Sequence, residues 1–308
     1  MNASAKFAGF ALGLAAVFGI ALAAGALIGP EPSEPGGHDE HAAPAAEGEM
    51  PGGLLVTDQG YTLALNQPDT TTSAQAPVSF RILDATGAPV TRYETSHDKD
   101  LHLIVVRRDM AAFQHVHPVL DQAGTWSVPL DLSRAGDYRV FADFTPAGGQ
   151  NLTLGTDLRV SGDYAVRPLP APATTARVGE YTVTLDGTVA PGTASKLTLS
   201  VSRDGRPVTD LQPYLGAYGH LVALRAADLA YLHVHPEGAP GDGVTPAGPG
   251  IEFVVNAPSA GDYRLFLDFQ HAGVVRTAEF TVRVAPPSTG TTGPAPTGDD
   301  HGTPGHGH

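Results

Sequence analysis

The stretch Ala135-Gly-Asp-Tyr-Arg-Val-Phe-Ala-Asp-Phe144 returns later in the chain as Ala260-Gly-Asp-Tyr-Arg-Leu-Phe-Leu-Asp-Phe269. Eight of the ten positions are identical, so the chain carries an internal duplication. In each copy a tyrosine precedes an apolar run. This pattern resembles a tyrosine corner, in which a tyrosine at the start of strand F hydrogen-bonds to upstream backbone in an immunoglobulin-like sandwich.

Side chains alternate between the two faces of a strand, so the run also predicts which residues face the core. Asp143 and Asp268 fall on the opposite, outer face. The predicted core positions are Tyr138, Val140, Ala142 and Phe144 in the first copy and Tyr263, Leu265, Leu267 and Phe269 in the second.

The remainder of each copy also predicts β-structure. Short runs rich in Val, Leu, Thr, Tyr and Phe are separated by Gly, Pro and Asp. Seven short strands in a unit of about 105 residues favour a β-sandwich. The predicted fold is therefore all-β, with two tandem immunoglobulin-like β-sandwich domains after an N-terminal transmembrane helix. In the first copy the strands are expected near residues 61–65, 77–84, 101–108, 113–118, 125–132, 138–145 and 152–160.

The N-terminus carries a membrane-targeting segment. Lys6 precedes an uncharged, mostly apolar run of 23 residues, 7–29. At about 1.5 Å per residue this run is long enough to cross a bilayer core of about 30 Å. It exceeds the usual signal-peptide core of about 7–15 residues, so we favour an uncleaved anchor over a cleaved signal. Both interpretations place the chain after Pro30 outside the cytoplasm: a single-pass cell-membrane protein, or a secreted one if the segment is cleaved.

Composition shifts divide the chain further. Segments rich in Pro, Gly and Ala that lack apolar periodicity predict a stalk, a linker and a tail. The expected boundaries are a transmembrane helix at 1–30, a flexible His-containing stalk at 31–53, the first sandwich at 54–164, a Pro-rich linker at 165–177, the second sandwich at 178–285, and a disordered His-rich tail at 286–308.

The bulk composition excludes several classes of function. The 308 residues include no cysteine, which rules out thiolate metal sites and disulfide bonds. A net charge of −14 argues against nucleic acid as a partner, because nucleic-acid binding requires clustered Lys and Arg. Only three methionines are present, so capture of Cu(I) by thioethers has no support.

A histidine pattern is repeated in the two copies. In each, one histidine is followed 13 residues later by a His-Val-His-Pro motif. Imidazole is the commonest metal ligand in proteins, and His-Val-His on a strand places both rings on one face. We therefore predict one divalent metal site in each sandwich. The ligands would be His102, His115 and His117 in the first copy and His220, His233 and His235 in the second.

Three imidazole nitrogens suit Cu(II), which we favour, and also Zn or Ni. Asp143 and Asp268 are candidates for a fourth ligand, or for a carboxylate that orients a ligand ring. The alternative is that the histidines are structural. His102 alternates with Ile104 and Val106, so its ring could be buried against apolar neighbours without any metal.

These motifs resemble those of a known family. The segments Tyr214-Leu-Gly-Ala-Tyr-Gly-His-Leu-Val-Ala-Leu-Arg225 and Tyr231-Leu-His-Val-His-Pro236 are similar to bacterial membrane-anchored exported proteins of a heavy-metal-binding type. The first copy is similar through Leu101-His-Leu-Ile-Val-Val-Arg-Arg108 and Phe113-Gln-His-Val-His-Pro118. The resemblance implies an extracytoplasmic role in the homeostasis of metal, with copper the foremost candidate.

The predicted function is therefore binding of a divalent metal outside the cytoplasm, for buffering or for delivery to a membrane metal transporter. The protein is not predicted to be an enzyme. No glutamate near the histidine triads is placed as a general base, and the sequence contains no Gly-x-Ser-x-Gly motif and no phosphate-binding loop. The main alternative is an adhesion or scaffolding module with structural histidines. The third possible function is that of a metalloenzyme whose metal is bound by histidines.

Overall fold

All regular structure that the computed structural model describes is β-sheet. The model describes residues 50–232 and 234–286. The predicted transmembrane helix, most of the stalk, His233 and nearly all of the tail lie outside these residues. Among the described residues, none belongs to a helix long and apolar enough to span a bilayer.

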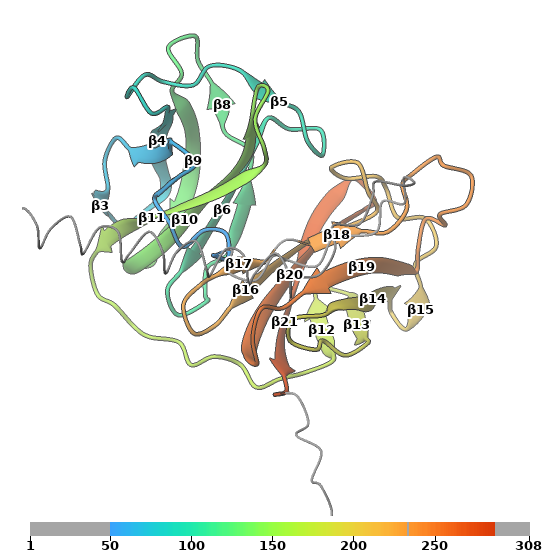
Figure 1. The fold of residues 1–308 in the computed structure, drawn as a ribbon. Coiled ribbons are helices and arrows are strands. Elements are labelled where there is room, and N and C mark those ends of the chain that lie inside the picture. Colours follow the sequence, from blue (N-terminus) through green and yellow to red (C-terminus); the bar gives the residue numbers. More distant parts are fainter. Residues whose placement is uncertain (1–49, 233, 287–308) are drawn as a thin grey trace, which may run out of the picture. The chain divides into compact units, whose positions relative to one another are not determined.

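The first sandwich consists of two sheets (Figure 1). One has the order β1 (Thr57–Asp58), β2 (Tyr61–Leu65), β4 (Ser73–Leu83), β9 (Trp126–Leu132) and β8 (Val119–Leu120). The other has the order β3 (Asp69–Thr71), β11 (Leu152–Ser161), β10 (Gly136–Pro146), β6 (Leu101–Arg107) and β7 (Gln114–Val116), with β5 (Tyr93–Glu94) paired to β10.

The second sandwich repeats this plan (Figure 1). One sheet has the order β12 (Thr175–Val178), β13 (Tyr181–Asp186), β14 (Ala194–Arg203), β19 (Gly250–Asn256) and β18 (Val234–Pro236), with β15 (Arg206–Pro207) paired to β14. The other has the order β17 (Tyr231–Leu232), β16 (His220–Arg225), β20 (Gly261–His271) and β21 (Val274–Val284).

The strand orders match the immunoglobulin-like arrangement, in which strands A, B, E and D form one sheet and C, F and G the other. The predicted tyrosine corner is present in both copies: the hydroxyl of Tyr138 donates to the carbonyl oxygen of Arg134, and that of Tyr263 to Ser259, each at 2.8 Å. The predicted core positions on β10 and β20 are all buried between the sheets of their own sandwich. The sandwich fold and the internal repeat are thus confirmed.

The outer faces of β6 and β10 are also buried, because they pack against the outer faces of β16 and β20. Every residue of β6 is buried, although successive side chains point in opposite directions. We call the packed set the apolar interface. Its buried members are Ile104, Val106, Met110, Phe141, Val222, Leu224, Leu229, Tyr231 and Phe266.

Contacts across the apolar interface are reciprocal. Phe113 of the first sandwich stacks on Phe266 of the second, with ring centroids 3.9 Å apart and planes 4° from parallel. Tyr231, which matches Phe113 in the repeat, contacts Phe141, which matches Phe266, at 5.8 Å. Each copy therefore uses the same positions to contact the other.

Two predicted boundaries differ from the structure. The expected strand at 113–118 is shortened to β7, because the chain crosses over at Pro118 and the next strand, β8, belongs to the opposite sheet of the first sandwich. The expected linker ends early, since β12 begins at Thr175 and pairs with β13.

The last residues of the predicted stalk also belong to the folded part. The amide of Tyr231 donates to the carbonyl of Gly52 at 2.9 Å, and the amide of Gly53 donates to the carbonyl of Thr153 at 2.7 Å. Gly53 has φ +74°, and a Cβ there would lie 2.4 Å from the Phe141 ring. Only glycine fits this position without strain.

Candidate metal centre

Three predicted ligands of the first sandwich come from one antiparallel pair of strands. His102 is the second residue of β6, His115 lies in the middle of β7 opposite Ile104, and His117 follows the end of β7. Since His102 shares a strand face with Ile104 and Val106, its ring points out of its own core toward the apolar interface.

The ring nitrogens of these histidines converge. Nδ1 of His102 lies 3.1 Å from Nε2 of His115 and 3.2 Å from Nε2 of His117. For metal–nitrogen bonds of about 2.0–2.1 Å, two ligands of a tetrahedral ion are separated by about 3.3 Å. Both distances from Nδ1 of His102 are therefore close to the spacing of ligands around one metal ion.

Hydrogen bonds on the far sides of two rings determine which nitrogens carry protons. Nε2 of His102 lies 3.1 Å from the carbonyl oxygen of Ser96, which can only accept, so Nε2 holds the proton. Nδ1 of His115 lies 2.7 Å from a carboxylate oxygen of Asp268 and holds the proton there. The nitrogens that face each other, Nδ1 of His102 and Nε2 of His115, are consequently both acceptors.

The second sandwich contributes the carboxylate that orients His115. Asp268 lies on β20 directly opposite His220 on β16. The side chains of His115 and Asp268 are only 1% and 3% exposed, so their contact is almost completely shielded from solvent. The other oxygen of Asp268 accepts a hydrogen bond from the hydroxyl of Thr277 at 2.6 Å. Asp268 was predicted beside a metal in its own sandwich, but it contacts a histidine of the other.

His220 also belongs to this group, which we call the histidine cluster: the rings of His102, His115, His117 and His220. The ring of His220 is stacked on that of His102, with centroids 5.4 Å apart, and its centroid lies 4.7 Å from that of His115. Its Nδ1 atom is buried and has no hydrogen-bond partner within residues 50–232 and 234–286.

The surroundings keep the rings of His102, His117 and His220 neutral. Burial, followed by the charge of His115, lowers the pKa of His117 to about 3. Burial also lowers the pKa of His102 to about 4, although the hydrogen bond to Ser96 opposes the shift. Burial also lowers the pKa of His220, to well below its ordinary value. Neutral imidazole is the form that binds metal ions.

Asp143 lies beside the cluster without joining it. It is opposite His102 in the β6–β10 pair, and it accepts hydrogen bonds from Asn151, at 2.9 Å, and from the hydroxyl of Tyr231. Burial raises the pKa of Tyr231 well above its ordinary value, and the carboxylate of Asp143 adds to the shift. Asp143 and Asp268 thus occupy equivalent positions, and each contacts the opposite sandwich.

The predicted second triad is not assembled among the described residues. His220 joins the cluster of the first sandwich, while His235 lies on β18, which belongs to the opposite sheet of the second sandwich. His233 lies outside the described residues. His235 is exposed and lines a pocket of about 200 Å³ together with His97, His102 and Asp143. This pocket gives the cluster a side exposed to solvent.

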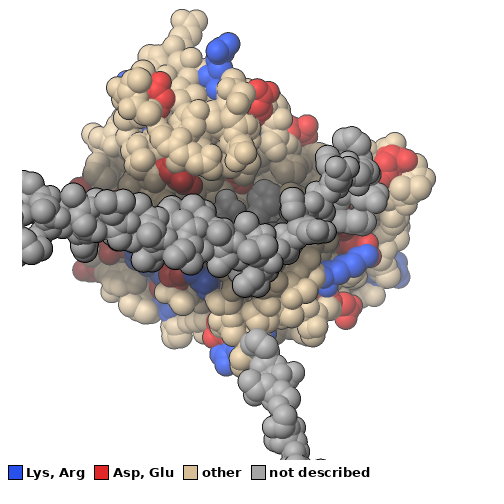
Figure 2. Space-filling view, in the orientation of Figure 1, with Lys and Arg blue, Asp and Glu red and all other residues tan. Residues whose placement is uncertain are grey.

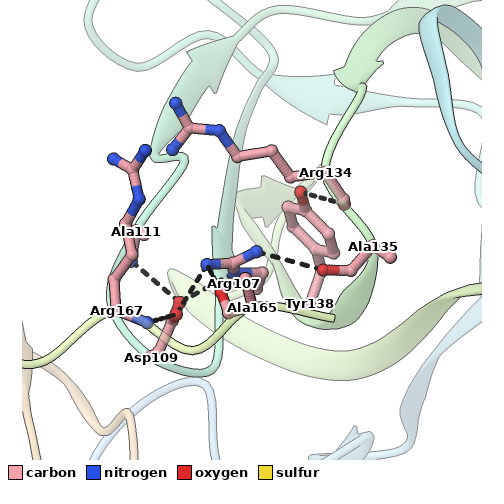
Figure 3. A network of polar contacts seen from close by, with 8 residues as sticks. All are labelled: Arg107, Asp109, Ala111, Arg134, Ala135, Tyr138, Ala165 and Arg167. Carbon is pink, nitrogen blue, oxygen red and sulfur yellow. Dashed lines mark hydrogen bonds and ion pairs between the residues drawn. The ribbon is translucent and has the colours of Figure 1, made fainter. Parts of the chain in front are cut away.

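The arginines that follow the first histidine of each copy form ion pairs with carboxylates. Arg107 pairs with Asp109 at 2.6 Å, and Arg225 pairs with Asp228 at 2.5 Å. Figure 3 shows that Arg107 also donates to the carbonyls of Ala135 and Ala165, so the pair fixes the start of the linker. The charge of Arg107 and the amides around Asp109 outweigh burial and lower the pKa of that carboxyl.

The described residues of the visible surface carry acidic and basic side chains interspersed, with no continuous basic area among them (Figure 2).

A further pattern in the sequence, on which none of the predictions above drew, indicates that the two sandwiches share the site. Ile104, Val106 and Phe141 lie on outer faces of the first sandwich yet are apolar, as are the matching positions of the second. Strands that are apolar on both faces are buried on both. This pattern indicates that the two outer faces pack together, which brings the histidines of β6 and β16 to one place.

The sequence was compared with known proteins. The family model described as "Domain of unknown function (DUF8832)" matches residues 56–162 and 176–286, one match for each sandwich. The chain belongs to the DUF8832 family. The two matches agree with the duplication and place one DUF8832 domain on either side of the linker. A search of functionally curated proteins gives no match to this DUF8832 chain.

Solved structures resemble the DUF8832 chain only distantly. The Escherichia coli adhesin FdeC is 15% identical with a TM-score of 0.24, and the match covers 73% of this chain and 64% of FdeC. InvD of Yersinia pseudotuberculosis is 12% identical with a TM-score of 0.24, covering 77% and 61%. Salmonella alpha-2-macroglobulin is 15% identical with a TM-score of 0.25, covering 76% and 15%. The chain thus spans less than two thirds of the length of these three chains.

Proposed function

We propose that this protein binds a divalent transition metal ion through the imidazoles of His102, His115 and His117, and that it buffers the ion or delivers it to a membrane transporter. The apolar run at residues 7–29 supports a position on the outer side of the membrane. Binding, rather than catalysis, is the role, because the convergent groups are all histidines, and hydrogen bonds hold two of them, His102 and His115, in fixed orientations.

One observation carries the proposal. Nδ1 of His102 and Nε2 of His115 are both acceptors, yet they lie 3.1 Å apart. Two lone pairs at this distance repel each other unless a cation lies between them. A proton carried by His102 is a poor candidate, because burial lowers the pKa of His102 to about 4. A metal ion bound by both nitrogens and by His117 removes the repulsion.

The donor set restricts the choice of metal. Three imidazole nitrogens suit Cu(II), Zn and Ni, and Cu(II) stands highest in the general order of affinity. No thiolate is available in this chain, and Met110 is packed in the apolar interface. The Asp268–His115 pair is the carboxylate–histidine arrangement that commonly orients a metal ligand.

The test is metal binding by the full chain purified without an affinity tag. We expect elemental analysis to find Cu or Zn, and competition titration to give a sub-micromolar dissociation constant. The double variant His115→Ala/His117→Ala should lose this binding. The matched control is His271→Ala, because His271 is bonded to Tyr181 and Asp210 away from the cluster. Equal affinity in the double variant and the control would contradict the proposal.

A second candidate function has its own support. The bonds from His115 to Asp268 and from His102 to Ser96 fix both rings without a metal, and the first of them joins the two sandwiches. The histidines would then be structural, and the tandem repeats would act as an adhesion or scaffolding module. Thermal stability that is unaffected by chelators and by added metal would favour this function over metal binding.

A further inference from the structure

We propose that His115 bridges two metal ions, because each of its ring nitrogens faces a separate donor set. The first ion binds at Nε2 with His102 and His117. The second binds at Nδ1 with His220 and Asp268. This inference rests on the proposed function, since the first ion is the one described above.

The second donor set already lies within reach of one ion. One ligand atom from each of His115, His220 and Asp268 can be chosen so that all three lie within 4.8 Å of one another. His220 and Asp268 are cross-strand neighbours on β16 and β20, so their side chains share a face of the sheet. That face is the one against which β7 places His115, whose Nδ1 lies 2.7 Å from Asp268.

His220 supplies an independent reason to expect a ligand. Its Nδ1 atom is buried and has no hydrogen-bond partner among the described residues. Buried polar atoms without partners are rare in folded proteins and call for an explanation, such as an ion. An ion held by His220 would supply the partner that the described residues do not.

Asp268 is also oriented to act as a ligand of the second ion. The hydroxyl of Thr277 donates to one carboxylate oxygen at 2.6 Å and leaves the other directed at His115. An ion between a nitrogen and an oxygen needs them about 3.3 Å apart, given bond lengths of about 2.0–2.2 Å. The carboxylate would therefore withdraw from Nδ1 by roughly half an ångström when the proton between them is replaced by a metal.

The chemical step is an exchange of a proton for a metal ion. With one ion bound, the Nδ1–H of His115 donates to Asp268. Binding of the second ion breaks that N–H bond, releases the proton to solvent and forms a metal–nitrogen bond, with no change in oxidation state. His115 then carries a negative charge as imidazolate. Together with Asp268 it offsets part of the charge of two divalent ions. The two ions would lie roughly 6 Å apart across the ring.

Cu(II) provides a direct test, since two Cu(II) ions joined by one imidazolate are magnetically coupled. The full chain is titrated with Cu(II), with a chelator present to withhold copper from weaker sites such as the terminal histidines. Electron paramagnetic resonance then measures the signal per bound ion. We expect the first equivalent to give the signal of an isolated ion, and the second to reduce the signal per copper at least twofold.

Variants separate the two sites. His220→Ala should bind one equivalent fewer and retain the isolated signal of the first ion, and His220→Gln should do the same with less loss of packing. His271→Ala should behave as the unmodified protein. A second equivalent that adds a full, uncoupled signal, with His220→Ala unchanged, would overturn the bridge but leave the first site intact. Failure to bind even one equivalent would overturn both proposals.

Discussion

Nδ1 of His115, in the first sandwich, donates a hydrogen bond to the carboxylate of Asp268, in the second, over a distance of 2.7 Å. The two residues are 153 positions apart in the chain, and their side chains are almost completely buried. This contact makes the ligand geometry of the first sandwich dependent on the second. Any change in how the sandwiches pack should therefore shift the ligands of the proposed metal site.

Asp268→Asn tests the orienting role of the carboxylate. The amide has no negative charge to hold the proton on Nδ1 of His115, so the ring loses its fixed orientation. We expect the affinity for the first metal ion to fall by about 10–100-fold, the usual effect of losing such a partner. Competition titration with Zn measures it.

The control for this change is Asp143→Asn, the equivalent position in the first sandwich. Asp143 bonds to Asn151 and Tyr231 and to none of the three imidazoles of the first site. We expect the affinity of the Asp143→Asn variant for the first ion to change by less than about threefold, the size of effect usual for substitutions away from a site. Equal losses in both variants would contradict an orienting role specific to Asp268.

Addition and removal of metal should change thermal stability. A ligand that binds only the folded state at 100 times its dissociation constant adds about 2.7 kcal/mol to the free energy of unfolding. For a protein of this size that corresponds to a rise in the melting temperature of roughly 5–10 °C. Melting followed by circular dichroism, with Zn and then with a chelator, should show the rise and its reversal. The variant His115→Ala/His117→Ala should show neither.

Phe266→Ala should loosen the apolar interface. The ring of Phe266 is fully buried and stacks on Phe113, so its removal leaves a cavity between the sandwiches. We expect a loss of about 3–5 kcal/mol in the free energy of unfolding. Denaturant titration should also separate into two transitions as the sandwiches become independent.

The matched change for that experiment is Val275→Ala on β21, whose side chain is partly exposed. We expect an effect within about 0.5 kcal/mol, as for most surface substitutions. A loss for Phe266→Ala as small as this would show that the apolar interface contributes little to stability.

The Arg107–Asp109 pair should make stability depend on acid pH. The pKa of Asp109 is lower in the folded protein than its ordinary value, so the unfolded state binds a proton first as pH falls. The stabilisation is thus complete above about pH 4, the ordinary pKa of aspartate, and is lost as pH falls through the folded pKa. Chemical denaturation at a series of pH values measures the loss.

Asp109→Asn should be strongly destabilised at neutral pH, by about 3–5 kcal/mol, because it leaves Arg107 buried without its partner. The difference from the unmodified protein should shrink as pH falls through the lowered pKa of Asp109, where Asp109 itself becomes neutral. Asp69→Asn breaks an exposed pair with Arg159 and should change stability by less than about 1 kcal/mol at any pH. A difference for Asp109→Asn that persists in acid would exclude the ion pair as its cause.

The fold of each sandwich could be predicted because its signals are local. The alternation after Tyr138 and Tyr263 identifies a strand with one core face, and the structure buries those residues as expected. The pairing of the first-copy histidines was predictable for the same reason, since His102 and His115 come from neighbouring strands joined by a short turn.

The sharing of the site between sandwiches could not be derived in this way. Periodicity shows which face of a strand is outside its own core, but it does not show what covers that face. The contacts of His115 with Asp268 and His220 depend on packing between segments far apart in the chain. Val234 and His235 of the second copy also lie differently from their first-copy counterparts, because β18 pairs with β19 of the other sheet.

The reciprocal contacts of Phe113 with Phe266 and of Tyr231 with Phe141 have an evolutionary consequence. Self-complementary contacts between equivalent positions characterise a twofold homodimer. A single ancestral unit with this surface would have associated with itself, and gene fusion would have made the association intramolecular. Because a tether raises the effective concentration of the partner surface, each half was then free to diverge. The two halves could then contribute different residues to one site, His115 from the first and His220 and Asp268 from the second.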